Sequence, residues 1–182
     1  MIFTRARTEP VTAKPRHGAE RPPMTLDDIH KAPGHLIRRS QQIAVAIFLD
    51  EMRPHDVTPI QYAALVAIQS HPGIDQRTLV DLIAIDRSTI GVALRRLEER
   101  GLLARVTPKH NQRIKQLFIA PAGSALLEAA RHKIDKVQER ILAPLNARER
   151  GTFMDLLARL VDINNSYSRA PLRAGARGDR AQ

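Results

Sequence analysis

The sequence predicts a mainly α-helical fold with one small β-hairpin, and three observations predict it. Apolar residues recur every three or four positions over most of residues 33–165, which is the spacing of amphipathic helices. Two short apolar stretches, 102–106 and 114–119, enclose a polar loop, as the strands of a hairpin do. Aromatic residues make up only 3% of the 182 residues, and tryptophan is absent. Leu, Ile, Val and Ala must therefore form the core of a single domain of ordinary size.

The helices before the hairpin are marked by start and stop signals. The first begins near Pro33 and reaches about Met52. Residues 58–61, Thr-Pro-Ile-Gln, open the second helix with an N-cap threonine, a proline at the first helical position and a glutamine that completes a capping box. This helix ends at about Ser70, before the sequence His-Pro-Gly. A short third helix is expected from residue 75 or 76 to about residue 83.

The fourth helix leads directly into the hairpin. Asp86 can accept hydrogen bonds from its first free backbone amides, and Gly101 is placed for a left-handed C-terminal cap. The third and fourth helices, joined at residues 84–85, make a helix-turn-helix. With the hairpin behind it, this unit is expected to be a winged helix-turn-helix. The buried stripe of the fourth helix should consist of Ile90, Ala93, Leu94 and Leu97.

Two further helices are expected after the hairpin. Residues 121 to about 145 carry a narrow apolar seam of the coiled-coil kind, and Asn146 to Glu149 form a second capping pattern that opens the last helix. A lone chain would leave the seam and the apolar residues of the last helix exposed, so we expect a second copy to cover them. An intramolecular helix pair is the alternative. The seam is Leu127, Ala130, Ile134, Val137, Ile141 and Leu145; the last helix carries Phe153, Leu156, Leu157, Leu160 and Ile163.

Positive charge is concentrated in three segments. The formal net charge of the chain is +10. Residues 76–115 have nine Lys and Arg against four acids, residues 1–24 have five against two, and residues 169–182 have four against one. The remainder is close to neutral, so the excess lies on the fourth helix, the hairpin and the two ends, which are expected to be a disordered basic arm and a disordered basic tail. This local excess indicates a polyanionic partner, with a merely solvated basic face as the alternative.

Composition and motifs also exclude several classes of function. The absence of cysteine removes disulfides, thiolate metal sites and thiol-based sensing. The seven histidines are scattered without metal-ligand spacing, and the chain has no Gly-rich phosphate loop and no nucleophile elbow. We therefore expect no catalytic residues, no metal and no cofactor. No apolar run is long enough to cross a bilayer and no hydrophobic segment follows the basic N-terminus, so a cytoplasmic protein is expected.

The exposed face of the fourth helix carries side chains suited to double-stranded DNA. A recognition helix reads bases with its N-terminal half in the major groove. Ser88 and Thr89 can hydrogen-bond base edges or phosphates. Val92 can pack on a thymine methyl group, and Arg95 can reach a guanine edge or a phosphate. An ordinary exposed helix face is the alternative, but the hairpin that follows favours DNA. The flanking phosphate contacts are expected to be Arg87 and Arg96.

The tip of the hairpin is polar and carries no acid. An arginine at such a tip can enter a minor groove, where the narrow walls concentrate negative potential. Arg113 is the candidate for this contact, with Asn111 beside it and Lys109 and Lys115 on the DNA backbone. A solvated turn is the alternative.

With this helix and hairpin, the chain resembles the MarR-type winged-helix repressors of bacteria. The resemblance covers roughly residues 33–165, and the block of helix, glycine and wing is fairly specific. One departure is in the wing, where the family usually has an acid followed by two arginines and this chain has Asn111, Gln112 and Arg113. The residues that carry the resemblance are Ser88-Thr89-Ile90, Leu94-Arg95-Arg96-Leu97-Glu98, Arg100-Gly101-Leu102-Leu103, Arg105 and Ile119-Ala120-Pro121-Ala122-Gly123.

The resemblance implies an obligate homodimer with interlocking terminal helices. Such a dimer binds a palindromic operator, with one helix and wing in each half-site. The implied organisation is an N-terminal dimerisation helix at 25–55, a winged helix-turn-helix at 56–120 and C-terminal dimerisation helices at 121–168.

The resemblance also implies a small-molecule effector. MarR-like regulators commonly release DNA when a phenolic or aromatic acid binds, and residues 35–42 resemble the first helix of members that respond to aromatic carboxylates. Arg38 or Arg39 can hold a carboxylate through two hydrogen bonds. His35 or Gln42 can bind a ring hydroxyl, and Tyr62 can line the same site. Inter-subunit salt bridges or phosphate contacts are the alternative for the two arginines.

The predicted function is therefore a ligand-responsive repressor, released by a small aromatic acid or its coenzyme A thioester. The alternative is an architectural or partner-recruiting DNA-binding protein without an effector. An enzyme is disfavoured because the chain has no catalytic motif.

Overall fold

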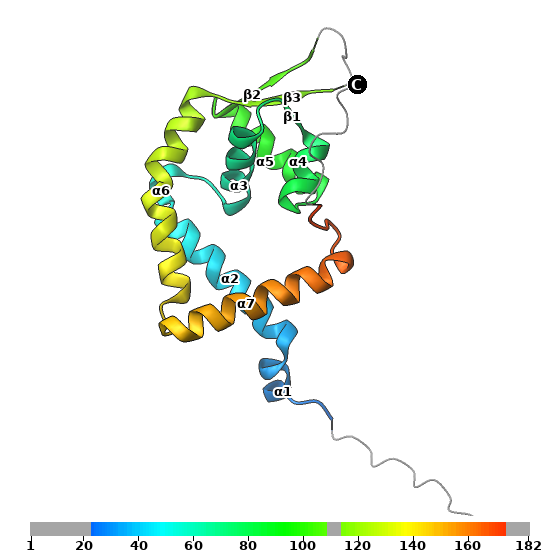
Figure 1. Ribbon diagram of the computed structural model, residues 1–182, viewed down its shortest axis with the longest axis vertical. Helices are drawn as coiled ribbons and strands as arrows, with labels where there is room; N and C mark the ends of the chain where they lie inside the picture. Colours follow the sequence, from blue (N-terminus) through cyan, green and yellow to red (C-terminus); the bar gives the residue numbers. More distant parts are fainter. Residues whose placement is uncertain (1–22, 109–113, 174–182) are drawn as a thin grey trace, which may run out of the picture. The chain divides into compact units, whose positions relative to one another are not determined.

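The computed structural model describes residues 23–108 and 114–173 (Figure 1). The chain divides into a first unit that ends at Ile37 and a second unit that begins at Arg38, and each is described by itself. Among the described residues, no helix is both long and apolar enough to cross a membrane.

The first unit contains a short helix that the sequence reasoning missed. Helix α1 spans Leu26–Lys31. The Thr25 side chain accepts from the backbone N–H of Asp28, and the Asp28 carboxylate accepts from the N–H of Thr25 at 2.9 Å. The pKa of Asp28 is lowered, chiefly by its hydrogen bond to the Thr25 backbone. The spacing of a threonine and an acid three residues apart is the signal that would have found this helix. The next helix, α2, spans Pro33–Glu51, as predicted to within one residue.

The helices of the helix-turn-helix begin where their capping residues predicted. Thr58 and Gln61 exchange two hydrogen bonds, at 2.9 and 3.3 Å, and open α3 at Pro59–Ser70. Asp75 caps α4 (Gln76–Ile83), and Asp86 caps α5 (Arg87–Glu99). Gly101 has φ +68° after α5, the left-handed conformation expected of a glycine at that position. A 3-10 turn, η1 (Arg53–His55), precedes α3.

The core lies where these three helices meet the sheet (Figure 1). The predicted stripe of α5 is confirmed, because its four members are buried and belong to one cluster with Leu65, Ile68 and Leu79. Burial of this apolar surface orients α5 and leaves its opposite face in solvent.

The sheet has three strands, where the sequence predicted two. Strands β2 (Leu103–Val106) and β3 (Gln116–Ile119) pair antiparallel, as expected of the hairpin. A third strand, β1 (Ile74–Asp75), pairs antiparallel with β3 on its other side, with Ile74 opposite Leu117. A two-residue strand carries no periodic pattern, so the pairing is decided by the buried Ile74 side chain and not by a local signal.

A close approach of two backbones joins the hairpin to helix α6, which spans Pro121–Leu142. The backbone N–H of Ala120 donates to the carbonyl oxygen of Leu102 at 3.1 Å. A Cβ atom at Gly123 would stand 2.1 Å from that same oxygen and 2.9 Å from Cγ1 of Ile119. Glycine at position 123 therefore permits this contact.

The apolar seam of α6 faces the same chain and not a second copy. Leu127, Ala130 and Val137 are buried in the main core, and Ile134 and Ile141 pack against it. The expectation that a lone chain would leave this seam exposed is therefore wrong, because the main core covers it. The alternative of a helix pair is not what covers the seam, since the last helix, α7 (Ala147–Asn164), has no buried residue. The helix also ends at Leu142, three residues earlier than predicted.

Ion pairs attach the far end of α6 to the end of α2. Nη1 of Arg140 lies 2.7 Å from Oδ2 of Asp50 and 2.7 Å from Oε1 of Glu51, and Nζ of Lys133 lies 3.7 Å from Glu51. Hydrogen bonds from Arg140 hold the pKa of Asp50 and of Glu51 below their ordinary values. They also raise the pKa of Arg140 itself.

The last helix, α7 (Ala147–Asn164), presents its apolar residues to solvent. Its start is confirmed, because Asn146 and Glu149 exchange hydrogen bonds of 2.9 and 3.0 Å. It has no buried residue, and Phe153, Leu156, Leu157, Leu160 and Ile163 are all exposed in the single chain. The expectation of an uncovered apolar face thus holds for α7.

The residues after α7 return to the helix-turn-helix. A 3-10 turn, η2 (Asn165–Tyr167), is followed by two hydrogen bonds between Asn165 and Leu172, at 2.8 and 2.9 Å. The N–H of Arg173 donates to the carbonyl oxygen of Asp81 in α4 at 3.0 Å. The predicted disordered tail at 169–182 is therefore wrong for residues 169–173, while 174–182 and 1–22 lie outside the described residues.

Candidate nucleic-acid interface

The N-terminus of α5 is organised by Asp86. Its carboxylate accepts from the backbone N–H of Thr89 at 2.9 Å, from Oγ of Ser88 at 2.5 Å and from Oγ1 of Thr89 at 2.6 Å. These bonds, that to the Ser88 hydroxyl first, hold the pKa of Asp86 well below its ordinary value. The hydroxyl groups of Ser88 and Thr89 both donate their protons to Asp86. Toward a ligand, these two hydroxyls therefore offer lone pairs and act as acceptors.

The outer face of α5 is available to a partner. Arg87, Ser88 and Arg95 are exposed, and Val92 keeps 47% of its surface in solvent. Within the described residues, Arg87 and Arg95 have no ion pair that would hold them back. The face predicted opposite the buried stripe is thus the exposed face of the helix, and its first two turns carry no acid after Asp86.

The far end of α5 is tied to other elements. Nε of Arg105, on β2, lies 2.9 Å from Oε2 of Glu98. Arg100 donates from Nη2 to the carbonyl oxygen of His55 at 2.9 Å, and from Nη1 to that of Asp56. The position of α5 is therefore coupled to the hairpin on one side and to the turn between α2 and α3 on the other.

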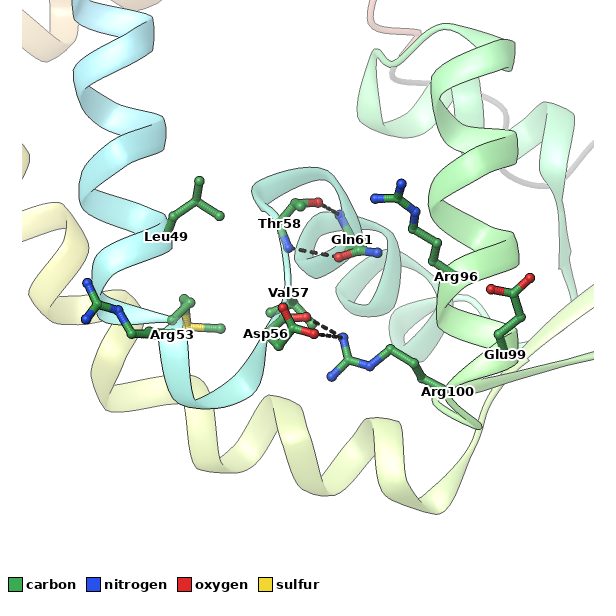
Figure 2. A pocket seen from close by; sticks show the side chains of 10 residues that line it. Leu49, Arg53, Asp56, Val57, Thr58, Gln61, Arg96, Glu99 and Arg100 are labelled. Carbon is green, nitrogen blue, oxygen red and sulfur yellow. Dashed lines mark hydrogen bonds and ion pairs between the residues drawn. The ribbon is translucent and has the colours of Figure 1, made fainter.

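A cavity of about 340 Å³ lies between the ends of α2 and α5 and the start of α3 (Figure 2). The sequence reasoning missed it, because its lining comes from two distant stretches of the chain, 49–61 and 96–100, and no local pattern joins them. Arg96, predicted as a phosphate contact, is among the lining residues, and in Figure 2 its side chain extends toward the start of α3. The lining residues are Leu49, Met52, Arg53, Asp56, Val57, Thr58, Gln61, Arg96, Glu99 and Arg100.

The wing is described only in part. Lys115 is exposed at the base of β3, where it can reach a phosphate. Lys109, Asn111 and Arg113 lie outside the described residues, so their predicted contacts stay predictions.

The structure brings together some of the predicted effector residues and not others. Nη1 of Arg38 donates to Oε1 of Gln42 at 2.8 Å, and Arg39 is exposed on the same helix. Tyr62 is half-buried, and its ring packs edge-on against Phe48 with 6.0 Å between centroids. Phe48 is ten residues beyond Arg38, roughly 15 Å along the helix axis. Burial raises the pKa of the Tyr62 hydroxyl.

His35 belongs to the first unit, where its ring lies 5.3 Å from that of His30. No group of three or more His, Cys, Asp or Glu side chains that could hold a metal occurs among the described residues.

Comparison with known proteins agrees with this geometry. Residues 55–114 match the MarR family model. The HTH-type transcriptional repressor NicR of Pseudomonas putida is 31% identical over 140 residues, which are 76% of this chain and 88% of that protein.

Two solved structures have the same fold. The PcaV transcriptional regulator of Streptomyces coelicolor, in complex with its natural ligand, is 36% identical with a TM-score of 0.68 over 76% of this chain and 98% of that one. Bordetella bronchiseptica BpsR, whose DNA binding is regulated by 6-hydroxynicotinic acid, is 28% identical with a TM-score of 0.68. The match covers 73% of this chain and 95% of that one. The winged helix-turn-helix and the relatives lead to one conclusion: this chain belongs to the MarR family of transcriptional regulators.

Proposed function

We propose that this protein is a ligand-responsive repressor that binds a palindromic operator as a homodimer. A small aromatic acid or its coenzyme A thioester releases it from the DNA. The observation that carries the proposal is the outer face of α5, where exposed arginines flank Ser88 and Val92 and the buried stripe holds the helix in place.

The roles on DNA follow from the chemistry of the exposed groups. Arg95 reaches a guanine edge or a phosphate, and Val92 packs on a thymine methyl group. Ser88 and Thr89 accept hydrogen bonds, for instance from the amino group of adenine or cytosine. The phosphate and wing contacts are Arg87, Arg96, Lys109, Asn111, Arg113 and Lys115.

Dimerisation would cover the apolar face of α7. Seven large apolar side chains stay exposed on this helix, and an apolar patch of this kind marks an interface in a soluble protein. In the proposed organisation, residues 25–55 and 121–168 form the dimer, and each 56–120 domain reads one half-site about 10 base pairs from the other.

The effector proposal is supported by the relatives and by the charge of α2. PcaV was solved with its natural ligand, and the DNA binding of BpsR is regulated by 6-hydroxynicotinic acid. Arg38 or Arg39 would hold the carboxylate, with His35, Gln42 and Tyr62 around the ring. Tyr62 packs beside Phe48, which lies roughly 15 Å along α2 from Arg38. One small ligand would therefore touch Arg38 and Tyr62 only if the two residues came from different chains of the dimer.

The DNA assignment is tested by fluorescence anisotropy on duplexes selected from a random pool. Arg95→Ala should weaken binding and relax the preference at one position of each half-site, by roughly 1–3 kcal/mol. Lys115→Ala should weaken binding on every sequence and reduce the salt slope by about one. Arg159→Ala on α7 removes the same charge far along the chain and should change neither quantity. Equal affinities for all four proteins would refute the assignment.

The effector assignment is tested by thermal-shift titration with benzoate, 4-hydroxybenzoate and their coenzyme A thioesters. A shift that weakens operator binding supports the ligand-responsive reading. A flat response to all four compounds favours the architectural alternative.

A further inference from the structure

The residues that follow α7 form a turn held by its own hydrogen bonds, here called the C-terminal strap (residues 165–173). The side chain of Asn165 binds both backbone groups of Leu172: Nδ2 donates to the carbonyl oxygen at 2.9 Å, and Oδ1 accepts from the N–H at 2.8 Å. Oγ of Ser168 accepts from the N–H of Ala170 at 3.2 Å. These bonds fix the path of the chain from η2 to Leu172.

The strap ends on α4, the first helix of the helix-turn-helix (Figure 1). The N–H of Arg173 donates to the carbonyl oxygen of Asp81 at 3.0 Å. Asp81 lies in the last turn of α4, where backbone carbonyls have no partner within the helix. The strap therefore supplies a hydrogen bond that α4 cannot make by itself, which explains why the chain is anchored at this point.

The anchor lies close to the start of α5. Asp81 is five residues before Asp86, the N-cap of α5, and five residues span at most roughly 17 Å even when fully extended. The first turns of α5 are the part proposed to enter the major groove, which is about 12 Å wide and has a phosphate backbone on each side. An arginine anchored at Asp81 is thus placed near the phosphates that flank this groove.

The strap exposes two arginines and partly covers the residues between them. Ala170 and Pro171 are half-buried, whereas Arg169 and Arg173 are exposed. Among the described residues, neither guanidinium has an ion pair or a hydrogen bond, although the backbone N–H of Arg173 is engaged. A guanidinium without a partner can hold a phosphate through two parallel hydrogen bonds.

The sequence continues this positive charge beyond the strap. Residues 174–182 add Arg177 and Arg180 against the single acid Asp179. Because Arg173 is bonded to α4, the charged segment begins at a fixed point on the helix-turn-helix. Fixing that point in advance lowers the entropy lost when the arginines bind, and each phosphate that they neutralise releases counterions.

We propose that the C-terminal strap is a second DNA-binding element, which places Arg173 on a phosphate beside the groove that α5 enters, with Arg177 and Arg180 further along the same backbone. The inference rests on the proposed function, because it extends the DNA surface proposed there. Phosphate contacts carry no sequence information. The strap therefore adds affinity and leaves the base preference unchanged, in contrast to Arg95.

Fluorescence anisotropy of the full chain tests the charge, on the selected operator and on a duplex of scrambled sequence, each over a series of salt concentrations. Arg173→Gln keeps the backbone bond to Asp81 and removes the charge. It should weaken binding to both duplexes about threefold to tenfold and reduce the salt slope by about one. Arg173→Lys should restore most of the affinity, and the control Arg159→Gln on α7 should behave as wild type. Wild-type affinity and slope in Arg173→Gln overturn the proposal.

Asn165→Ala tests the anchoring separately from the charge. This variant keeps every arginine and loses both bonds to Leu172. It should weaken binding to both duplexes about twofold to fivefold, because the arginines then become ordered only on binding. Circular dichroism and thermal unfolding establish that the variant is folded. If a folded Asn165→Ala protein binds as wild type does, the charge acts without the strap, which contradicts the proposal.

The same titrations separate this proposal from the proposed function. If Arg95→Ala and Lys115→Ala weaken binding but Arg173→Gln does not, the strap proposal fails and the proposed function stands. If only Arg173→Gln weakens binding, the strap stands and the assignment of α5 fails; a wild-type chain that binds neither duplex refutes both. Light scattering gives the mass of Arg173→Gln, and its conversion to monomers would place Arg173 against a second chain and overturn the proposal.

Discussion

The guanidinium of Arg100, the residue that follows α5, joins the end of this helix to the turn before α3, with Nη2 donating to the carbonyl oxygen of His55 at 2.9 Å. A second bond reaches the carbonyl oxygen of Asp56. Both acceptors are backbone atoms of the segment that also lines the cavity. A displacement of this turn would therefore be transmitted to α5, the helix that carries the proposed DNA contacts.

Replacing Arg100 with methionine should destabilise the fold. The side chain is 35% exposed, so water replaces part of what is lost, and we expect a decrease of about 1–2 kcal/mol in the free energy of unfolding. Urea unfolding measures this decrease in the free energy of unfolding. Arg95→Met, on the exposed face of the same helix, should stay within about 0.5 kcal/mol of wild type. Identical urea midpoints for the two variants would mean that the Arg100 bonds do not hold the turn.

Gly123→Ala should destabilise the protein by about 2–3 kcal/mol, because the new methyl group meets the Leu102 carbonyl oxygen, a backbone atom that moves only with the hairpin. Gly151→Ala is the control, since nothing lies within 4 Å of its Cβ position in α7. That substitution should stabilise the helix by about 0.5–1 kcal/mol. Thermal unfolding measures the stability of both variants. A Gly123→Ala protein as stable as wild type would show that the backbones at Gly123 and Leu102 are not in contact.

Asp86 should contribute stability that depends on pH. Its folded pKa is lowered from the ordinary value of 3.8, so the contribution is present above that value and is lost as the pH falls through the folded pKa. Asp86→Asn keeps an N-cap acceptor and removes the charge. The difference in urea midpoint between wild type and Asp86→Asn should therefore be largest at neutral pH and shrink in acid. A difference that is constant between neutral and acidic pH would contradict the charge-dependent bonds to Ser88 and Thr89. Asp155→Asn on α7 serves as the control for loss of an exposed carboxylate.

The exposed face of α7 should form a subunit interface. Leu156→Ser combined with Leu160→Ser removes two of its large apolar side chains and should convert a dimer into monomers. Light scattering coupled to size exclusion measures the mass. Val66→Ser removes an exposed apolar side chain from α3 and should leave the dimer intact. Persistence of the dimer in the double α7 variant would place the interface elsewhere.

The helix starts could be predicted because their determinants are local. Thr58 with Gln61, and Asn146 with Glu149, bond within three residues of each other, so the chemistry that opens each helix is present in a short stretch of sequence. The missed helix α1 has the same kind of signal at Thr25 and Asp28, which its lack of apolar periodicity concealed. The buried stripe of α5 was predictable because helical spacing alone assigns residues to one face.

The candidate site was only half predictable. The exposed face of α5 follows from the stripe opposite, but the place of Arg96 depends on how α3 packs beside α5. Tyr62 was grouped with Arg38 on chemistry alone, whereas the structure packs its ring against Phe48. The spacing of residues within one helix does not specify which other element of the fold packs against that helix.

By itself, the sequence determined the helices, their caps, the hairpin and the side of α5 that meets solvent, since each depends on bonds or faces set within a few residues. Tertiary structure alone decided three things: the pairing of Ile74 with Leu117 in a third strand, the burial of the α6 seam within its own chain, and the cavity at Arg96. The physical reason is common to all three. An apolar face specifies that it must be covered but not by what, and the covering element is chosen by packing between residues distant along the chain.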